Sequence, residues 1–286
     1  MSNRALVTHH DLDGIGSIIL SIVLHIDFNQ VYISNYSRMT RSFAERLGRD
    51  FDEVIVTDIS FGEFIQPNMR EFDHHGIHDE GRCGTWLFYY NYIPNELHTG
   101  RLDSFVRSVD AYDTWKRDDH EWFEKGKWWN YLFIQLTNGL HRTNYNLNLS
   151  HIEGSPWRRV IEVFTRMMNP DFEQLTPQLN AMIENMRHIL GDEYRRIRNT
   201  YQVREVRGIR FIDFRLASQI NDIDNSMLMS VIREQLDLNV VILRFRGPKA
   251  SLRSSADFNL NQIPSFTGHA HAGVALQEEI DRFFRE

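Results

Sequence analysis

Short apolar runs and amphipathic segments alternate along the first 130 residues. The apolar runs have the length and β-branched content of buried strands, and the segments between them carry apolar residues at helical spacing. We predict strands at residues 4–8, 30–35, 53–57 and 69–72, and helices at 14–26, 41–47, 87–92 and 102–109. This alternation is typical of a parallel sheet covered by helices, so the predicted fold class is α/β.

The rest of the chain follows two other patterns. Residues 115–129 are aromatic and charged, which favours a helical connector packed on the first domain, with stacking on nucleic-acid bases as the alternative. Helical spacing continues over 157–168 and 177–198. From residue 206 on, we predict strands at 210–214, 240–245 and 250–254, a helix at 225–236, and a final helix that begins at the glycine-histidine turn 268–273.

The length of the chain, 286 residues, exceeds that of a typical single domain. We therefore expect an N-terminal parallel-sheet domain over 1–130, a helical connector over 131–205 and a smaller C-terminal α/β domain over 206–286. No stretch reaches the ~20 apolar residues that a membrane span needs. The catalytic-looking cluster follows the first strand directly, so we expect no signal peptide and a cytoplasmic protein.

The net charge and the cysteine content limit the class of substrate and the kinds of site that we expect. The net charge of −7 argues against a broad basic face for long nucleic acids, whereas a small anionic substrate remains compatible. Cys83 is the single cysteine, which excludes an intrachain disulfide and a thiolate zinc site, so we expect it to be structural.

Acidic residues and histidines follow the predicted strands in clusters. Carboxyl ends of parallel strands meet at one edge of a sheet, so these side chains are expected to converge. The candidates are His9, Asp11, Asp13, Asp58, Asp73, His74, His75, Asp110 and Asp113. Mixed imidazole and carboxylate donors suit Mn²⁺, Fe²⁺ or Zn²⁺. A two-metal site of this kind activates water for phosphoester hydrolysis.

These motifs resemble those of the DHH phosphoesterase superfamily. Asp73-His74-His75 is similar to the motif that names it, and residues 9–17, Asp58 and the pair Asp110/Asp113 are similar to its other motifs in the same order. The resemblance implies two Mn²⁺ ions, with Mg²⁺ or another divalent metal as the alternative. It implies that His75, with Asp73, acts near the scissile phosphate. The implied metal ligands are His9, Asp11, Asp13, Asp58, His74 and one of the last pair, of which we favour Asp113 over Asp110.

The C-terminal part resembles the DHH-associated substrate-binding domain. The resemblance rests on the serine-arginine strand 251–255 and the glycine-histidine turn 268–273. An arginine fork binds phosphate or carboxylate, and a glycine turn exposes backbone N–H groups to an anion. The expected substrate-binding residues are Arg253, Ser254, Gly268, His269 and His271.

We therefore predict a Mn²⁺-dependent phosphodiesterase that hydrolyses short oligonucleotides or nucleotide phosphoesters. The alternatives are a cyclic dinucleotide phosphodiesterase, a single-strand-specific exonuclease, a phosphomonoesterase and a pyrophosphatase. A nucleotide-sensing module without turnover is the non-enzymatic alternative. The expected partner is a short nucleic acid or nucleotide and not a membrane, and a homodimer stays open.

Overall fold

The computed structural model divides the chain into two compact units, unit 1 (Met1–Asn180) and unit 2 (Ala181–Glu286), which we describe separately. The structure describes residues 2–74, 81–137, 145–147, 154–169, 176–215, 227–229, 231–232, 236, 240–244, 247–254, 258–269 and 272–285. Over these ranges, no helix combines the length and the apolar character needed to cross a bilayer.

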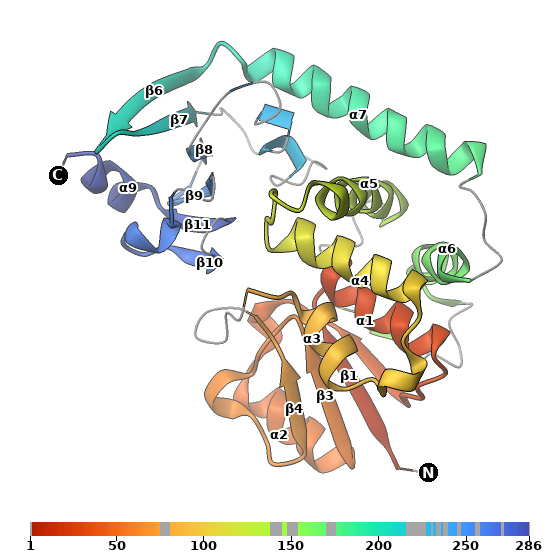
Figure 1. The fold of residues 1–286 in the computed structure, drawn as a ribbon. Helices are drawn as coiled ribbons and strands as arrows, with labels where there is room; N and C mark the ends of the chain where they lie inside the picture. Colours follow the sequence, from red (N-terminus) through yellow and green to blue (C-terminus); the bar gives the residue numbers. More distant parts are fainter. Residues whose placement is uncertain are drawn as a thin grey trace. The chain divides into compact units, whose positions relative to one another are not determined.

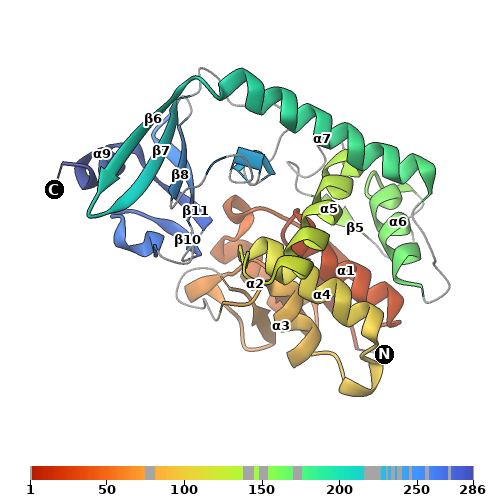
Figure 2. The same cartoon turned by 45° about the horizontal axis from the view of Figure 1, so that its top comes forward.

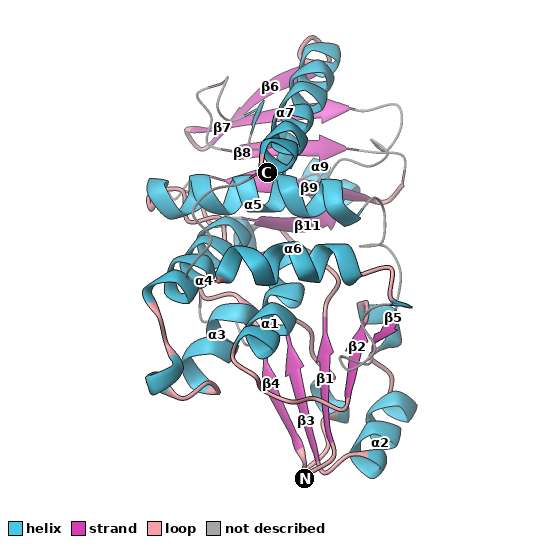
Figure 3. Ribbon diagram, turned by 90° about the vertical axis from the view of Figure 1, so that its right-hand side faces the viewer, coloured by secondary structure: helices cyan, strands magenta, loops and turns pink. Residues whose placement is uncertain are grey.

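Unit 1 is built on a five-stranded sheet with the order β4-β3-β1-β2-β5. The strands are β1 (Arg4–Thr8), β2 (Gln30–Ile33), β3 (Glu53–Thr57), β4 (Met69–Phe72) and β5 (Tyr145–Leu147). Strands β1 to β4 are parallel, with Leu6 opposite Ile55, and β5 is antiparallel to β2 at the edge. Figure 3 shows β1 to β4 running side by side, so their carboxyl ends share one edge.

Helices lie on both sides of this sheet (Figure 1). They are α1 (Leu12–Val23), α2 (Arg41–Asp50), α3 (Gly84–Asn91), α4 (Gly100–Asp113), α5 (His120–Thr137) and α6 (Arg158–Met168), with short 3-10 turns at Tyr36–Arg38, Gly62–Phe64 and Asn95–Leu97. On one face, Ala5 and Val7 pack with Phe43 and Leu47 of α2. Alternate residues of a strand point to opposite faces, so Leu6, which is fully buried, faces the other layer.

Polar residues before the helices determine where they begin. Thr40 and Thr99 precede α2 and α4, and their side chains accept the N–H of Phe43 and Leu102. Cys83 is buried and does the same for α3, because its sulfur accepts the N–H of Trp86 at 3.4 Å. These caps satisfy backbone donors that the first turn of a helix leaves open.

Unit 2 contains α7 (Pro177–Ile197), apart from its first residues, and a six-stranded sheet with the order β10-β11-β9-β8-β7-β6 (Figure 2). Its other elements are β6 (Tyr201–Val206), β7 (Ile209–Arg215), β8 (Val240–Arg244), β9 (Lys249–Ser254), a 3-10 turn (Leu260–Gln262), β10 (Thr267–His269), β11 (Ala272–Leu276) and α9 (Gln277–Phe283). Phe211, Ile242 and Leu252 belong to its core. Arg244 pairs with the fully buried Asp213 at 2.8 Å.

The structure confirms the α/β class and most of the predicted elements, with shifted ends. The helix predicted at 14–26 runs from Leu12 to Val23. Of the helix predicted at 225–236, the described residues 227–229 and 231–232 are helical, and the others, except residue 236, lie outside the described residues. Residues 115–129 include the start of α5, as the connector interpretation expects. The domain boundaries at 130 and 205 stay a prediction, because compactness does not show which segments fold independently.

One prediction was wrong. The final helix does not begin at the glycine-histidine turn: Thr267–His269 and Ala272–Leu276 are antiparallel strands, and α9 starts only at Gln277. Strand β11, with the sequence AGVAL, pairs with β9 from Ala272 opposite Arg253 to Leu276 opposite Lys249. Pairing with a neighbouring strand is tertiary information that a local pattern does not carry.

Gly126 marks the closest approach of α5 to α4. A Cβ at this position would lie 2.0 Å from the carbonyl oxygen of Ser108 and 2.6 Å from the Cβ of Tyr112, so α5 would have to move away. We expect Gly126→Ala to lower the free energy of unfolding by about 1–3 kcal/mol, the usual cost of overpacking, as measured by urea denaturation. Gly100→Ala is the matched control, because nothing lies within 4 Å of its added Cβ. Equal stability of the two variants would contradict this packing.

Candidate metal centre

The turn from β1 into α1 presents His9, Asp11 and Asp13 at the carboxyl edge of the sheet. Asp11 is the cap of α1 and accepts the N–H of Gly14 at 3.0 Å. The turn is so tight that a Cβ on Gly14 would lie 2.3 Å from the carbonyl oxygen of His9. Glycine at this position therefore lets the chain fold back and bring the three side chains together.

Asp58 follows β3 at the same edge. Its backbone is in the left-handed region, with φ of 57°, a conformation that costs about 1–3 kcal/mol for a residue other than glycine. The first turn of α3 packs against it, and a Cβ on Gly84 would lie 2.5 Å from the Asp58 nitrogen. Side chain and backbone of Asp58 are thus held in place, and the residue is 1% exposed.

Asp13 is held by the same first turn of α3. Its two carboxylate oxygens accept the N–H groups of Gly84 and Thr85, each at 2.7 Å, and the Thr85 hydroxyl bonds to its carbonyl. Backbone N–H groups at a helix start favour an anion, so the start of α3 is a suitable partner for this buried carboxylate.

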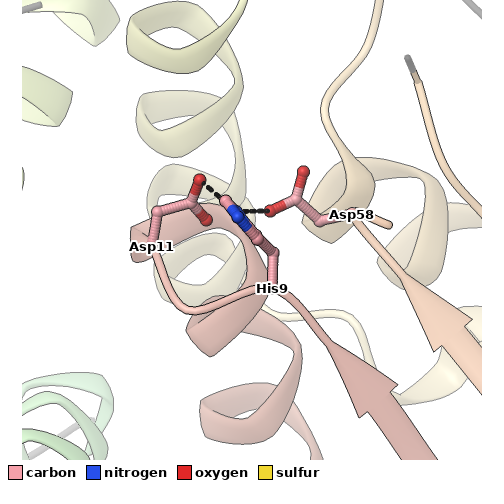
Figure 4. A group of neighbouring side chains, drawn as sticks. All are labelled: His9, Asp11 and Asp58. Atoms are coloured by element: carbon pink, nitrogen blue, oxygen red, sulfur yellow. Dashed lines mark hydrogen bonds and ion pairs between the residues drawn. The ribbon is translucent and has the colours of Figure 1, made fainter. Parts of the chain in front are cut away.

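Two groups of potential metal donors result. In the first, His9 Nδ1 lies 2.8 Å from Asp11 Oδ2 and 3.6 Å from Asp58 Oδ2 (Figure 4). In the second, His74 Nε2 lies 3.4 Å from Asp13 Oδ2 and 3.5 Å from Asp113 Oδ2. Within each group the donor atoms lie within 4.8 Å of one another.

Asp58 connects the two groups. Its Oδ2 faces His9, and its Oδ1 lies 3.0 Å from His74 Nε2. One carboxylate therefore offers an oxygen to each group, which is the arrangement of a bridging ligand between two metal ions.

Burial and neighbouring charges shift the pKa values of these residues. Burial, with the charges of Asp11 and Asp13, raises the pKa of Asp58 well above its usual range. Burial opposes ionisation of Asp11 too, but the neighbouring His9 brings the pKa of Asp11 well below its usual range. Burial lowers the pKa of His9, and the charge and hydrogen bond of Asp11 more than compensate and raise it. A divalent cation relieves the same repulsion between the carboxylates.

Asp110 lies outside both groups and has other partners. Its carboxylate accepts the Cys83 N–H at 2.8 Å and pairs with Arg82 at 2.9 Å and Lys116 at 2.7 Å. Of the two aspartates at the end of α4, Asp113 is therefore the one beside His74.

The remaining candidates are placed as follows. Asp73 is buried directly after β4, and its charge contributes to the raised pKa of His9. His75 and His271 lie outside the described residues. In unit 2, Arg253 and the buried Ser254 lie on β9, and Gly268 and His269 lie on β10. Arg253 donates to the carbonyl of Leu252 at 2.8 Å.

The sequence motifs did not indicate Tyr36 as a site residue. Its ring centroid lies 5.5 Å from that of His9, and its side chain is 47% exposed. Burial of its hydroxyl and the charges of Asp58 and Asp73 raise its pKa, so it stays protonated beside the carboxylates. The available signal was its position shortly after the strand QVYI, in the 3-10 turn that begins after Ser34 and Asn35.

Comparison with known proteins identifies the fold. No family model matches the sequence, and no curated protein matches it. Two solved structures share its fold. A pGpG-specific phosphodiesterase, PggH, from Vibrio cholerae has a TM-score of 0.58 at 16% identity, over 98% of this chain and 95% of its own. The DHH domain of a member of the s1p family of ribosomal proteins has a TM-score of 0.59 at 13% identity, over 99% and 86%.

The chain has the DHH fold. The resemblance inferred from the motifs is thereby confirmed at the level of the fold. In the structure, His9 and Asp11 lie between β1 and α1, Asp13 lies in the first turn of α1, and Asp58 directly follows β3.

The two aspartates of α4 give a direct test of the metal centre. We expect Asp113→Asn to weaken Mn²⁺ binding by more than about tenfold. Even the loss of a residue that only contacts a metal ligand typically lowers metal affinity by about 10- to 100-fold. Asp110→Asn is the matched variant: it should leave Mn²⁺ affinity nearly unchanged and lower stability by about 1–3 kcal/mol, because it weakens buried hydrogen bonds. Calorimetric Mn²⁺ titration and urea denaturation measure both. An equal loss of metal affinity in the two variants would refute the assignment.

Proposed function

We propose that the chain is a metal-dependent phosphodiesterase that hydrolyses short oligonucleotides or other nucleotide phosphoesters. The observation that carries the proposal is the buried Asp58 carboxylate, which offers one oxygen to each donor group. The DHH fold, which it shares with a phosphodiesterase, adds support.

The donor set fits divalent ions. Four carboxylates and two imidazoles gather at one edge of the sheet, and burial with the neighbouring carboxylates raises the pKa of Asp58. Imidazole together with carboxylate favours Mn²⁺ over Mg²⁺ or Ca²⁺, and we propose two Mn²⁺ ions held by His9, Asp11, Asp13, Asp58, His74 and Asp113. Bound there, divalent ions supply acidified water and positive charge for hydrolysis at phosphorus.

The protein's own groups orient the reaction. The Asp58 carboxylate lies between the two donor groups, with one oxygen toward each. The backbone N–H groups of α3 hold Asp13 in place. We assign Asp73 and His75 to the scissile phosphate on the strength of the motif. Tyr36, beside His9 and half exposed, is positioned to stack on a base or donate its hydroxyl to the substrate.

Substrate binding outside the metal centre is proposed for Arg253, Ser254, Gly268, His269 and His271. An arginine on β9 opposite Ala272 of β11 provides a guanidinium for a phosphate group. The net charge of −7 and a fold shared with an enzyme for pGpG, a linear dinucleotide, favour short substrates over long strands.

The test is hydrolysis by the full chain. With Mn²⁺ we expect di- to pentanucleotides to yield mononucleotides, and EDTA to stop the reaction reversibly. Asp58→Asn should lower kcat/KM by more than about 100-fold, because removing a metal ligand should reduce activity more than removing a residue that only contacts a ligand. Asp118→Asn, an exposed aspartate preceding α5, is the control with unchanged activity.

The competing functions give different results. Faster turnover of cyclic dinucleotides would favour the cyclic dinucleotide phosphodiesterase. A preference for long single strands with steeply salt-dependent binding would favour the exonuclease. Metal-independent nucleotide binding without turnover of any phosphodiester would replace the enzyme by a sensor, and the proposal would be abandoned.

Tyr36 provides a separate test of substrate contact. We expect Tyr36→Ala to raise KM by about 5- to 100-fold, which corresponds to the loss of one base-stacking contact, while Mn²⁺ affinity stays the same. Tyr36→Phe keeps the ring and serves as the control. If Tyr36→Ala has the KM of the unmodified chain, Tyr36 does not touch the substrate.

A further inference from the structure

Unit 1 contains a pocket that the metal centre does not use. It has a volume of about 290 Å³, near the lower end of the range for small-molecule sites, and so suits one small ligand. It is lined by Arg82, Trp86, Tyr90, Arg107, Asp110 and Asp119. None of these belongs to the two groups of metal donors.

One wall of the pocket is aromatic. Trp86 and Tyr90 stand one helical turn apart on α3, and their ring centroids are 4.5 Å apart with planes at 38°. Both rings are partly exposed. The guanidinium of Arg82 lies 4.7 Å from the Trp86 centroid, which adds a flat cationic surface to the wall. A planar aromatic ligand can stack on such a surface.

The pocket also presents two guanidinium groups, whose formal charge the carboxylates of Asp110 and Asp119 balance. Arg82 and Lys116 share the single carboxylate of Asp110. Arg107 uses its Nε to pair with Asp103 at 2.8 Å. The side chains of Arg82 and Arg107 are 44% and 52% exposed, and a guanidinium has five N–H donors. Their remaining donors fit a phosphate group.

A carboxylate completes the lining. Asp119 is exposed and lies just before α5. A carboxylate accepts N–H groups, which the edge of a nucleobase such as guanine provides. The three features thus match three parts of one ligand. The aromatic wall matches the face of a base, the guanidinium groups match a phosphate, and the carboxylate matches the edge of the base.

We propose that this pocket binds a nucleoside monophosphate, with the base on Trp86 and Tyr90 and the phosphate on Arg82 and Arg107. The site is separate from the metal centre, and the inference goes beyond the proposed hydrolysis. Binding here requires neither metal nor turnover.

The experiment uses the full chain with Asp58→Asn, in EDTA, so that no metal holds the phosphate. Calorimetric titration compares GMP with guanosine, which lacks the phosphate, and ribose 5-phosphate, which lacks the base. We expect GMP to bind at least about tenfold more tightly than either part, because each contact contributes at least one factor of ten. Trp86→Leu and Arg107→Gln, added to this background, should each weaken GMP binding by about tenfold or more.

Arg49→Gln is the matched control, since Arg49 is an exposed arginine of α2 with a side chain 72% exposed, and it should bind GMP like the background protein. Circular dichroism checks the fold of each variant, and the exposed Arg107 keeps the test decisive if Trp86→Leu unfolds. Equal affinity for GMP and ribose 5-phosphate would leave only an anion site and overturn the proposal. GMP binding that neither variant changes would place the nucleotide elsewhere and overturn it too.

Discussion

Repulsion between buried carboxylates is the constraint on which the rest of unit 1 depends. Asp58 is 1% exposed and lies beside other aspartates, so its pKa is raised and the site favours either a proton or a metal cation. The fold maintains this unfavourable arrangement through a left-handed backbone at Asp58 and a glycine contact from α3. Strain and repulsion concentrated at one point are typical of a functional site rather than of a structural core.

The first turn of α3 organises the surroundings. Its backbone N–H groups hold two carboxylates from other elements: Cys83 donates to Asp110, while Gly84 and Thr85 donate to Asp13. The start of one helix therefore holds both the metal donor Asp13 of α1 and the buried carboxylate of Asp110 on α4. The nucleotide pocket shares this scaffold through Arg82 and Asp110, which places it next to the centre in structure although it has a different chemistry.

Local sequence patterns predicted the strands of the first sheet and the order of the candidate ligands. Each strand and each ligand cluster consists of residues that are contiguous in the sequence. The strand before Asp58 and the cluster 9–13 needed only periodicity and the geometry of parallel strands. The sequence favoured Asp113 over Asp110 but kept both, because the difference between them depends on Arg82 and Lys116 reaching the Asp110 carboxylate across the fold. Strands β5, β6, β10 and β11 were missed for a related reason: β5 and β10 are only three residues long, and all four are defined by pairing with a neighbouring strand.

The neighbours at 13% and 16% identity show how little of the sequence this fold requires. A fold that is shared at such low sequence identity determines where the strands end, and therefore where the candidate ligands converge. It does not determine which molecule the protein binds. Residues outside the motifs must therefore provide selectivity. In this chain the candidate is Tyr36, since its ring lies beside that of His9, is half exposed and belongs to none of the motifs.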